Sequence, residues 1–211
     1  MREKPVRRPS EPRVRFTRQV AEDRRLALIE SAIECLKRHG HEGLSVRRIA
    51  AHAGVSIGLI NHHFPNKNQL IAAAYRHFNS HLIDGLVRSV EEGPAEPRAR
   101  LKAFFKATFS PPNLDRDVLA VWVVFWGLYR HSREIQNVHR ETYRGFVELV
   151  RGMIGELAKD AGRKHFSPRL GAIGLTALID GLWLEWCLDP ETFSPREAVA
   201  LCERWVEGLV A

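Results

Sequence analysis

The chain has 211 residues, 45% of them hydrophobic and 27% charged, which suits one large domain or two small ones and excludes disordered and fibrous proteins. The net charge of +7 is distributed unevenly along the chain. Residues 1–64 carry 13 Lys/Arg and 7 Asp/Glu, whereas residues 65–211 carry 19 Lys/Arg and 18 Asp/Glu. No apolar run approaches the roughly 20 residues of a membrane span and no secretory signal is present, so we expect a cytoplasmic protein without a membrane partner.

Residues 1–20 contain three prolines and seven Lys/Arg with little periodicity, which predicts a flexible basic arm. The excess of positive charge in residues 1–64 is typical of a nucleic-acid-binding segment, so such an arm either follows the DNA backbone or reaches into a minor groove beside a docked domain. The other reading is a disordered extension that contacts nothing, and the sequence favours neither.

Residues 21–66 have the pattern of a three-helix head. Apolar residues recur at helical spacing over 21–39, and Gly40 ends that segment. Ser45 is a good N-cap for a second helix, which Gly54 ends by supplying the positive φ of a sharp turn. Ser56 then caps a third helix over about 57–63, so the last two helices form a helix-turn-helix.

The third helix is mostly small or polar, so most of its surface is free to enter a major groove. We expect Asn61 to read adenine, Ile57 or Leu59 to touch a thymine methyl, and Ser45 and Arg48 to contact phosphates. The alternative for each residue is a solvated side chain without a DNA contact. The candidate DNA-binding residues are Ser45, Arg47, Arg48, Ser56, Ile57, Gly58, Leu59, Asn61, His62, His63 and Lys67.

This stretch resembles the signature of the TetR family of DNA-binding repressors. The matching positions are Ala53, Gly54, Val55, Ser56, Gly58, His62, Phe64, Lys67 and Leu70. The resemblance implies phosphate contacts for His62 and Lys67. Two departures are Asn61 and His63, which stand where the family usually has tyrosines, and they leave open which bases or phosphates are touched.

Residues 67–211 read as a ligand-binding and dimerisation domain made of further helices. We predict helices over about 67–90 and 98–109, a third opened by an Asn113 cap, and a fourth that starts after Ser132 and reaches about Asp160. Ser167-Pro168 opens the next, and a capping box at 194–197 opens the last. The fold class is therefore all-α, with about nine helices.

The last two predicted helices carry more apolar surface than one chain can cover. The helix that follows Pro168 is apolar nearly all round, which indicates burial on both sides. The simplest way to bury this apolar surface is against the same two helices of a second copy of the chain. We therefore predict a homodimer with a four-helix interface. A twofold dimer spaces two recognition helices by about 34–36 Å, which predicts a palindromic operator.

A second group of residues suggests a small-molecule site. Four aromatic residues share one face of the helix after Asn113, and the later helix adds Trp183 and a lone internal acid, Asp180. Clustered aromatic rings attract quaternary ammonium ions, and a buried carboxylate neutralises a cation. The alternatives are an ordinary aromatic core and an Asp180 that caps a helix or bridges a dimer. The candidate ligand-binding residues are Trp122, Phe125, Trp126, Tyr129, Asp180 and Trp183.

Two segments, Ala120-x-Trp122-x-x-Phe125-Trp126 and 177–184, resemble the C-terminal domain of BetI-type repressors, the choline-responsive branch of the TetR family. The resemblance implies a repressor released by a quaternary ammonium compound such as choline. The alternative is a regulator of efflux or catabolic genes that holds a bulky hydrophobic ligand among the aromatic rings.

Other chemistry is not expected. The three cysteines Cys35, Cys187 and Cys202 have no paired spacing and fall in apolar helical patterns, so we interpret them as reduced core residues. His77 and His81 stand at i, i+4 without an acidic or thiol partner, so we expect no metal and no cofactor. The sequence also has no GxSxG, P-loop or HExxH motif, and we expect no enzyme activity.

Overall fold

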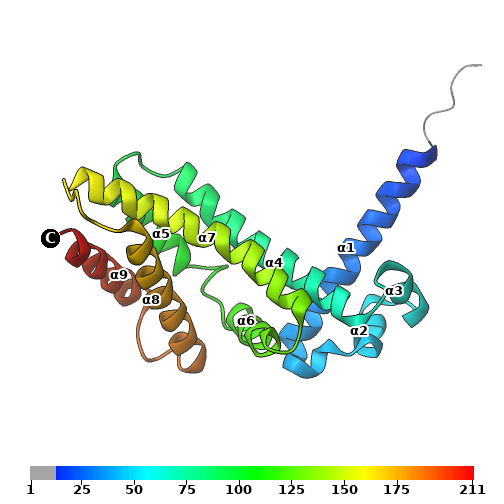
Figure 1. Ribbon diagram of the computed structural model, residues 1–211. Helices are drawn as coiled ribbons and strands as arrows, with labels where there is room; N and C mark the ends of the chain where they lie inside the picture. Colours follow the sequence, from blue (N-terminus) through cyan, green and yellow to red (C-terminus); the bar gives the residue numbers. More distant parts are fainter. Residues whose placement is uncertain (1–12) are drawn as a thin grey trace, which may run out of the picture.

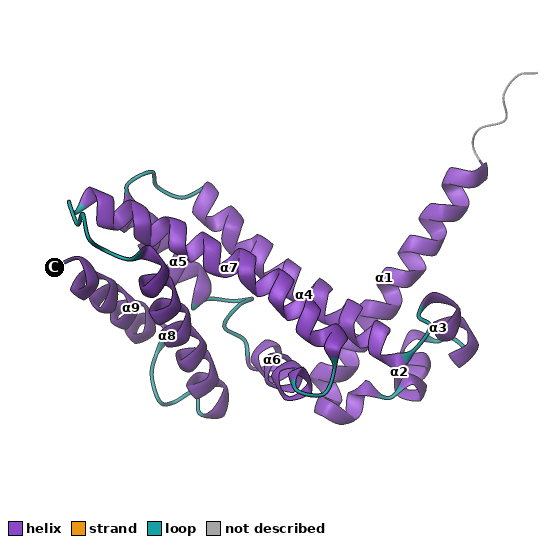
Figure 2. Cartoon of the chain, viewed as in Figure 1, coloured by secondary structure: helices purple, strands orange, loops and turns teal. Residues whose placement is uncertain are grey.

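The computed structural model describes residues 13–211, and this part of the chain is helical without any strand (Figures 1 and 2). The predicted all-α class with nine helices is confirmed. A 3-10 helix, η1 (Gly40–Leu44), follows the first helix. The helices are α1 Arg13–His39, α2 Val46–Ala53, α3 Ile57–His63, α4 Lys67–Glu91, α5 Pro97–Thr108, α6 Arg116–Tyr129, α7 Arg133–Asp160, α8 Pro168–Leu188 and α9 Pro195–Val210.

The chain forms an elongated molecule with the head at one end (Figure 1). Helices α1, α2 and α3 make the head, and α5, α8 and α9 lie at the opposite end. The two long helices α4 and α7 pack along each other between these ends, and α6 packs on α1. The two ends of the molecule are therefore connected by continuous helices.

The first helix starts earlier than predicted. It begins at Arg13, so the prediction of a flexible arm over 1–20 is wrong for residues 13–20, and residues 1–12 lie outside the described part. The physical reason is that residues 13–39 contain no proline and no glycine, so nothing in this stretch breaks the helix before Gly40.

Side-chain caps fix where most helices begin. The predicted capping box is present at α9, where Ser194 and Glu197 each accept from the other's backbone N–H. Sequence reasoning missed one cap, because α6 starts at Asp115 rather than at Asn113. The Asn113 side chain is buried and donates to the Ala107 carbonyl instead. Carboxylate and hydroxyl oxygens thus satisfy the free N–H groups at helix starts.

Two hydrophobic clusters fill the interior. The first joins the buried faces of α1, α2 and α3 to α4 up to Leu82, and it continues into α6 and the first turns of α7. The second lies among the end of α4, α5, the later part of α7, α8 and α9. The head core is therefore continuous with the core around α6.

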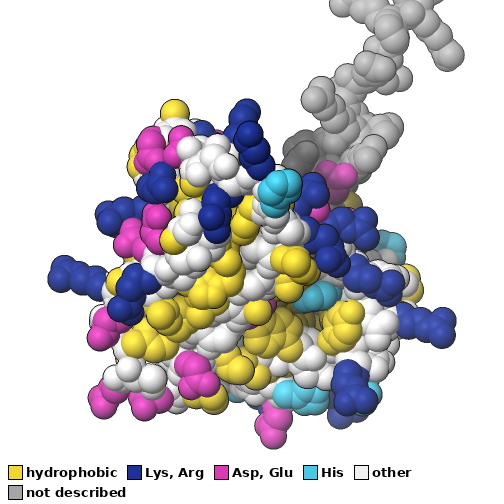
Figure 3. All heavy atoms as spheres, turned by 60° about the vertical axis from the view of Figure 1, so that its left-hand side comes forward, with side chains coloured by type: hydrophobic (Ala, Val, Ile, Leu, Met, Phe, Trp, Pro, Cys, Tyr) yellow, Lys and Arg dark blue, Asp and Glu magenta, His cyan; other side chains and the backbone are white. Residues whose placement is uncertain are grey.

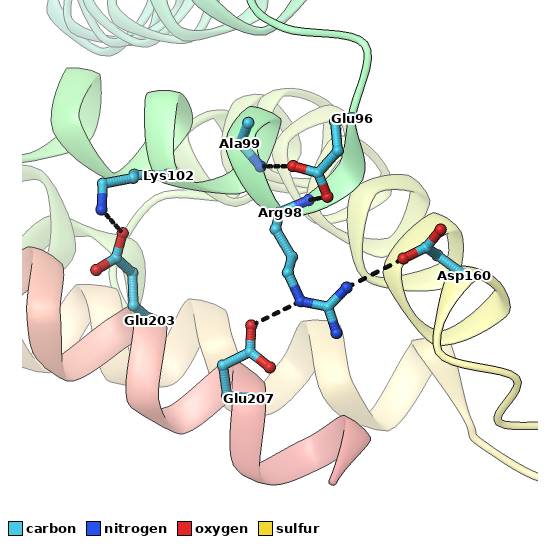
Figure 4. A network of polar contacts seen from close by, with 7 residues as sticks. All are labelled: Glu96, Arg98, Ala99, Lys102, Asp160, Glu203 and Glu207. Carbon is cyan, nitrogen blue, oxygen red and sulfur yellow. Dashed lines mark hydrogen bonds and ion pairs between the residues drawn. The ribbon is translucent and has the colours of Figure 1, made fainter.

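Exposed ion pairs tie α5 across α7 and α9 (Figure 4). The Arg98 guanidinium lies 3.0 Å from Glu207 of α9 and 3.0 Å from Asp160 of α7. Lys102 forms a further pair with Glu203 of α9 at 3.0 Å. Exposed pairs of this kind are screened by salt and orient helices more than they stabilise them.

Helix α8 is buried on one face only within the single chain, in contrast to the predicted burial on both sides. Leu170 (63% exposed), Ile173 (46%) and Leu188 (69%) face outward. By length and composition α8 would also suit a membrane span, which the sequence reading overlooked. Its inner face packs on α6, α7 and α9. Gly174 lets Trp205 of α9 approach so closely that a Cβ would lie 2.6 Å from the indole.

Candidate functional site

The helix-turn-helix has the predicted local geometry. Gly54 adopts φ +66°, the left-handed conformation that lets α2 turn sharply into α3. Ser56 caps α3 by accepting from the Leu59 N–H at 3.2 Å, whereas Ser45 stands at the N-cap position of α2 without a side-chain bond. Ile60 and Phe64 are buried and fix α3 on the head. The α3 residues that face outward are Ile57, Gly58, Asn61 and His62.

Most of the candidate DNA-binding residues are accessible on this surface. Three of them, Ser45, Leu59 and His63, are half-buried. The exposed ones are Arg47, Arg48, Ser56, Ile57, Gly58, Asn61, His62 and Lys67. They come from α2, α3 and the first turn of α4, the elements that a helix-turn-helix presents to a duplex.

Helix α1 supports the recognition helix from behind. The Arg25 guanidinium lies 4.7 Å from the centre of the Phe64 ring, a cation–π contact that joins α1 to the end of α3.

Burial lowers the pKa of His63, with nearby His62 and Arg24 acting in the same direction. The neutral form of His63 is therefore favoured near neutral pH.

A small cavity of about 20 Å³ lies among α4, α6, α7 and α8. Nearly all of its wall is apolar or aromatic, and Asp180 is the one carboxylate among the described residues that line it. The volume holds about one water molecule, so any larger guest requires side chains to move. The lining residues are Leu82, Ile83, Leu86, Trp122, Thr142, Tyr143, Phe146, Asp180 and Trp183.

Three of the six candidate ligand-binding residues meet at this cavity: Trp122, Asp180 and Trp183. The other three do not line it. Phe125 is fully buried against Tyr75, with ring centres 4.5 Å apart. Trp126 borders a separate apolar crevice with Trp122, Trp183 and residues of α8. Tyr129 packs edge-on against His139 at 5.2 Å. Helical spacing put the four aromatics on one face, but neighbouring helices divide that face between core and cavity.

Asp180 is half-buried and accepts a hydrogen bond from α7. The Tyr143 hydroxyl donates to its carboxylate at 2.9 Å. Burial raises the pKa of Asp180 from its ordinary value of 3.8 to about 6, against the opposing effect of the Tyr143 bond. Burial also raises the pKa of Tyr143 to about 12. The cavity thus destabilises the ionised carboxylate, and Asp180 is mostly ionised only when the pH is above about 6.

The remaining walls are held by buried polar contacts. The indole of Trp183 donates to the Thr108 carbonyl of α5 at 3.4 Å. Between α4 and α7, the Asn79 amide donates to Thr142, a lining residue, at 2.9 Å. These bonds fix the indole and the α4–α7 contact around the carboxylate.

Sequence reasoning named no residue of α4 or α7 at the ligand site, although these helices supply six of the nine lining residues. It selected aromatic residues and one acid on α6 and α8, and it did not select Thr142, Tyr143 or Phe146 of α7. The one available signal was helical spacing, which puts Val138, Thr142 and Phe146 at i, i+4 and i+8 on one side of α7, with Tyr143 three residues before Phe146. That spacing predicts a core face, and only the fold brings the Tyr143 hydroxyl to Asp180.

Both the head and the C-terminal part of the molecule match known protein families. Residues 28–74 match the domain described as bacterial regulatory proteins of the tetR family. Residues 97–211 match the C-terminal domain of BetI-type transcriptional repressors. The HTH-type transcriptional regulator BetI of Paraburkholderia phymatum is 30% identical over 190 residues, which is 90% of this chain and 94% of that protein. The regulator of the same name from Yersinia pestis is 30% identical over 87% of this chain and 91% of its own.

Solved structures share the fold. A protein from Pseudomonas aeruginosa PAO1 assigned to transcriptional regulation is 45% identical, with a TM-score of 0.85 over 94% of this chain and 95% of that one. A regulator from Saccharomonospora viridis in complex with choline is 23% identical, with a TM-score of 0.77 over 88% and 96% of the two chains. Members of this family bind DNA and small-molecule effectors, usually as dimers, and are not enzymes. The chain belongs to the TetR family of transcriptional regulators and carries the BetI-type C-terminal domain.

Proposed function

We propose that this regulator is a ligand-responsive repressor that binds a palindromic operator as a dimer and is released by a small organic cation with a quaternary ammonium group, such as choline. The observation that carries the proposal is the Asp180 carboxylate, which is half-buried, lines a largely aromatic cavity and accepts a hydrogen bond from the Tyr143 hydroxyl. A buried anion without a counter-charge is unfavourable, and a cation of the right size removes that penalty.

The chemistry of the cavity favours a quaternary ammonium group over a metal or a primary amine. Trp122 and Trp183 supply aromatic faces, which attract an ammonium by about 2 kcal/mol or more when it is desolvated. Few polar groups are available to replace the water of a small, strongly hydrated ion. The Saccharomonospora viridis regulator, which has the same fold, was solved in complex with choline, a quaternary ammonium compound.

The small cavity volume supplies the link to DNA release. A ligand larger than water requires α4, α6, α7 and α8 to adjust, and α4 leads into the head. Only a difference in ligand affinity between the DNA-binding and the released state provides the coupling energy.

Two titrations test the proposal. The first follows tryptophan emission while choline, betaine aldehyde and the uncharged isostere 3,3-dimethylbutanol are added. The second is a mobility shift of the DNA flanking the protein's own gene at about 0.15 M salt, with and without the same compounds. We expect the two cations to change emission and to release DNA. An equal response to all three compounds contradicts a cation site and supports a hydrophobic ligand instead.

Dimerisation through α8 and α9 predicts that a charge on the outward face of α8 separates the protomers. Ile173 is 46% exposed there. Hydrophobic side chains gather on the face of the molecule that Figure 3 shows. We expect Ile173→Glu to give a 24.1 kDa monomer in sedimentation equilibrium and to weaken operator binding at least about tenfold, because two heads no longer bind together. Leu26→Glu, a similarly exposed position on α1, is the control and should leave the dimer intact.

The proposed division of roles in the head predicts two different DNA phenotypes. Asn61→Ala removes a base contact, so we expect a loss of about 1–3 kcal/mol on the operator and relaxed preference at one position. Lys67→Ala removes a phosphate contact, so binding to all duplexes should weaken alike and the salt slope should fall by about 1. Mobility shifts on operator and unrelated DNA at several salt concentrations separate the two. Identical behaviour of the variants contradicts the assigned roles.

A further inference from the structure

A continuous path of polar and aromatic contacts leads from the cavity to the helix that enters the head. Asp180 of α8 accepts from Tyr143 at 2.9 Å, and the Tyr143 ring stacks on His139 with centres 4.9 Å apart and planes 16° apart. The His139 Nδ1 atom shares a 2.9 Å hydrogen bond with the Tyr75 hydroxyl of α4. The path therefore crosses from α8 through α7 to α4.

Tyr75 lies where this path meets both the cavity wall and the head. Its ring packs on Phe125 at 4.5 Å and edge-on to Trp122 at 5.9 Å, and Trp122 also lines the cavity. Earlier on the same helix, Leu70 is part of the head core. A displacement of Tyr75 thus acts on the same continuous helix that carries Lys67.

The groups on the path have a limited set of hydrogen-bond partners: Thr176 is a second partner within reach of Tyr143, and Asn79 of Tyr75. Tyr75 is buried, and Tyr143 and His139 are half-buried. Burial lowers the pKa of His139, so its imidazole is neutral near pH 7, with one nitrogen donating and the other accepting. Because a buried polar group without a partner is costly, the path has a small number of discrete arrangements rather than a continuous range.

We propose that Tyr143, His139 and Tyr75 are positioning residues that transmit the state of Asp180 to α4, with Tyr143 as the residue that senses it. This inference rests on the proposed function for the identity of the ligand, because a cation at Asp180 competes for the lone pairs that Tyr143 now uses. The arrangement around His139 then changes, and with it the bond to Tyr75.

The first test changes Asp180 itself, without any ligand, so that transmission from Asp180 to α4 is measured independently of which ligand binds. Asp180→Leu removes the acceptor of Tyr143 without adding a ligand. We expect amide hydrogen exchange in the 67–79 segment of α4 to accelerate about fivefold or more in the otherwise unchanged dimer, within the range of typical coupling between sites. In a Tyr75→Phe background the same substitution should change exchange less than about twofold. If the leucine variant does not fold, Tyr143→Phe removes the same bond from the other side and carries the same expectation.

Tyr129→Phe is the matched control. Tyr129 also packs on His139, but its hydroxyl makes no hydrogen bond within the described part of the chain. The response to Asp180→Leu should persist in this background. A full response in the Tyr75→Phe background, or no response in the unchanged chain, overturns the path.

A separate experiment, with tetramethylammonium as the probe, tests whether a cationic ligand acts through this path. Saturating tetramethylammonium should give the same exchange pattern in 67–79 as Asp180→Leu, and Tyr75→Phe should abolish the pattern while leaving the dissociation constant within about threefold. Purely structural damage would instead weaken binding and transmission together. Failure of tetramethylammonium to bind contradicts the cationic ligand, while the Asp180→Leu comparison still decides on the path.

Discussion

Gly43→Ala is expected to destabilise the DNA-binding head by about 3 kcal/mol and to abolish operator binding. Gly43 lies in η1, where the chain turns back against α1, and it is buried. A Cβ at this position would lie 2.1 Å from the Cys35 carbonyl oxygen and 2.9 Å from the Leu36 nitrogen. Both atoms belong to the backbone of α1, so no side-chain rotation relieves the overlap and the helix itself must shift.

Urea unfolding followed by circular dichroism measures this effect, and a mobility shift measures the loss of DNA binding. Gly85→Ala is the control, because Gly85 lies inside α4 and a Cβ there would meet no other element of the described chain within 4 Å. Alanine there should leave the protein unchanged or stabilise it by up to about 1 kcal/mol. A Gly43→Ala protein as stable as the Gly85→Ala protein contradicts the close packing of η1 on α1.

Asp180→Asn is expected to weaken binding of choline and tetramethylammonium by about 30-fold or more, corresponding to about 2 kcal/mol, because it removes the only carboxylate among the described residues that line the cavity. The amide still accepts the Tyr143 hydrogen bond, so the fold and the unliganded affinity for DNA should be retained. Glu185→Gln removes an exposed carboxylate from the same helix and is the control. Unchanged cation affinity in Asp180→Asn contradicts the proposed ligand site.

The pKa of Asp180 adds a pH dependence with a defined sign. Its folded value of about 6 lies above the ordinary 3.8, so between these values the folded protein holds a proton that the unfolded chain releases. This group's contribution to stability therefore falls as pH rises from about 4 to about 6. Cation affinity changes the opposite way and should be about tenfold weaker at pH 5 than at pH 8, because the carboxylate must be ionised. Both dependences should be missing in Asp180→Asn.

The elements that depend on local chemistry could be predicted from the sequence. The capping box at Ser194, the turn at Gly54 and the bounds of α3 depend on a few neighbouring residues, and each was predicted where it occurs. The caps of α6 and the start of α1 were misplaced by competing local signals, since Asn113 and Asp115 are both good caps and the basic composition after Pro12 suggested an arm.

The cavity could be predicted only in part, because it depends on contacts between distant segments. Trp122, Asp180 and Trp183 were identified from their residue types, and they do meet. Helical spacing alone did not separate them from Phe125, which faces α4, or from Tyr129, which faces α7. The role of Tyr143 depends on how α7 crosses α8, a geometry set by the packing of the whole domain.

The continuity of the head core with α6 has a consequence for protein engineering. Chimeric regulators are often imagined as interchangeable modules, with a new operator specificity obtained by exchanging everything before Lys67. Here such a junction would leave the Val118, Val121 and Trp122 side of α6 facing a foreign surface, because these residues share one cluster with the head. A workable graft must retain this shared layer or redesign it together with the transplanted part.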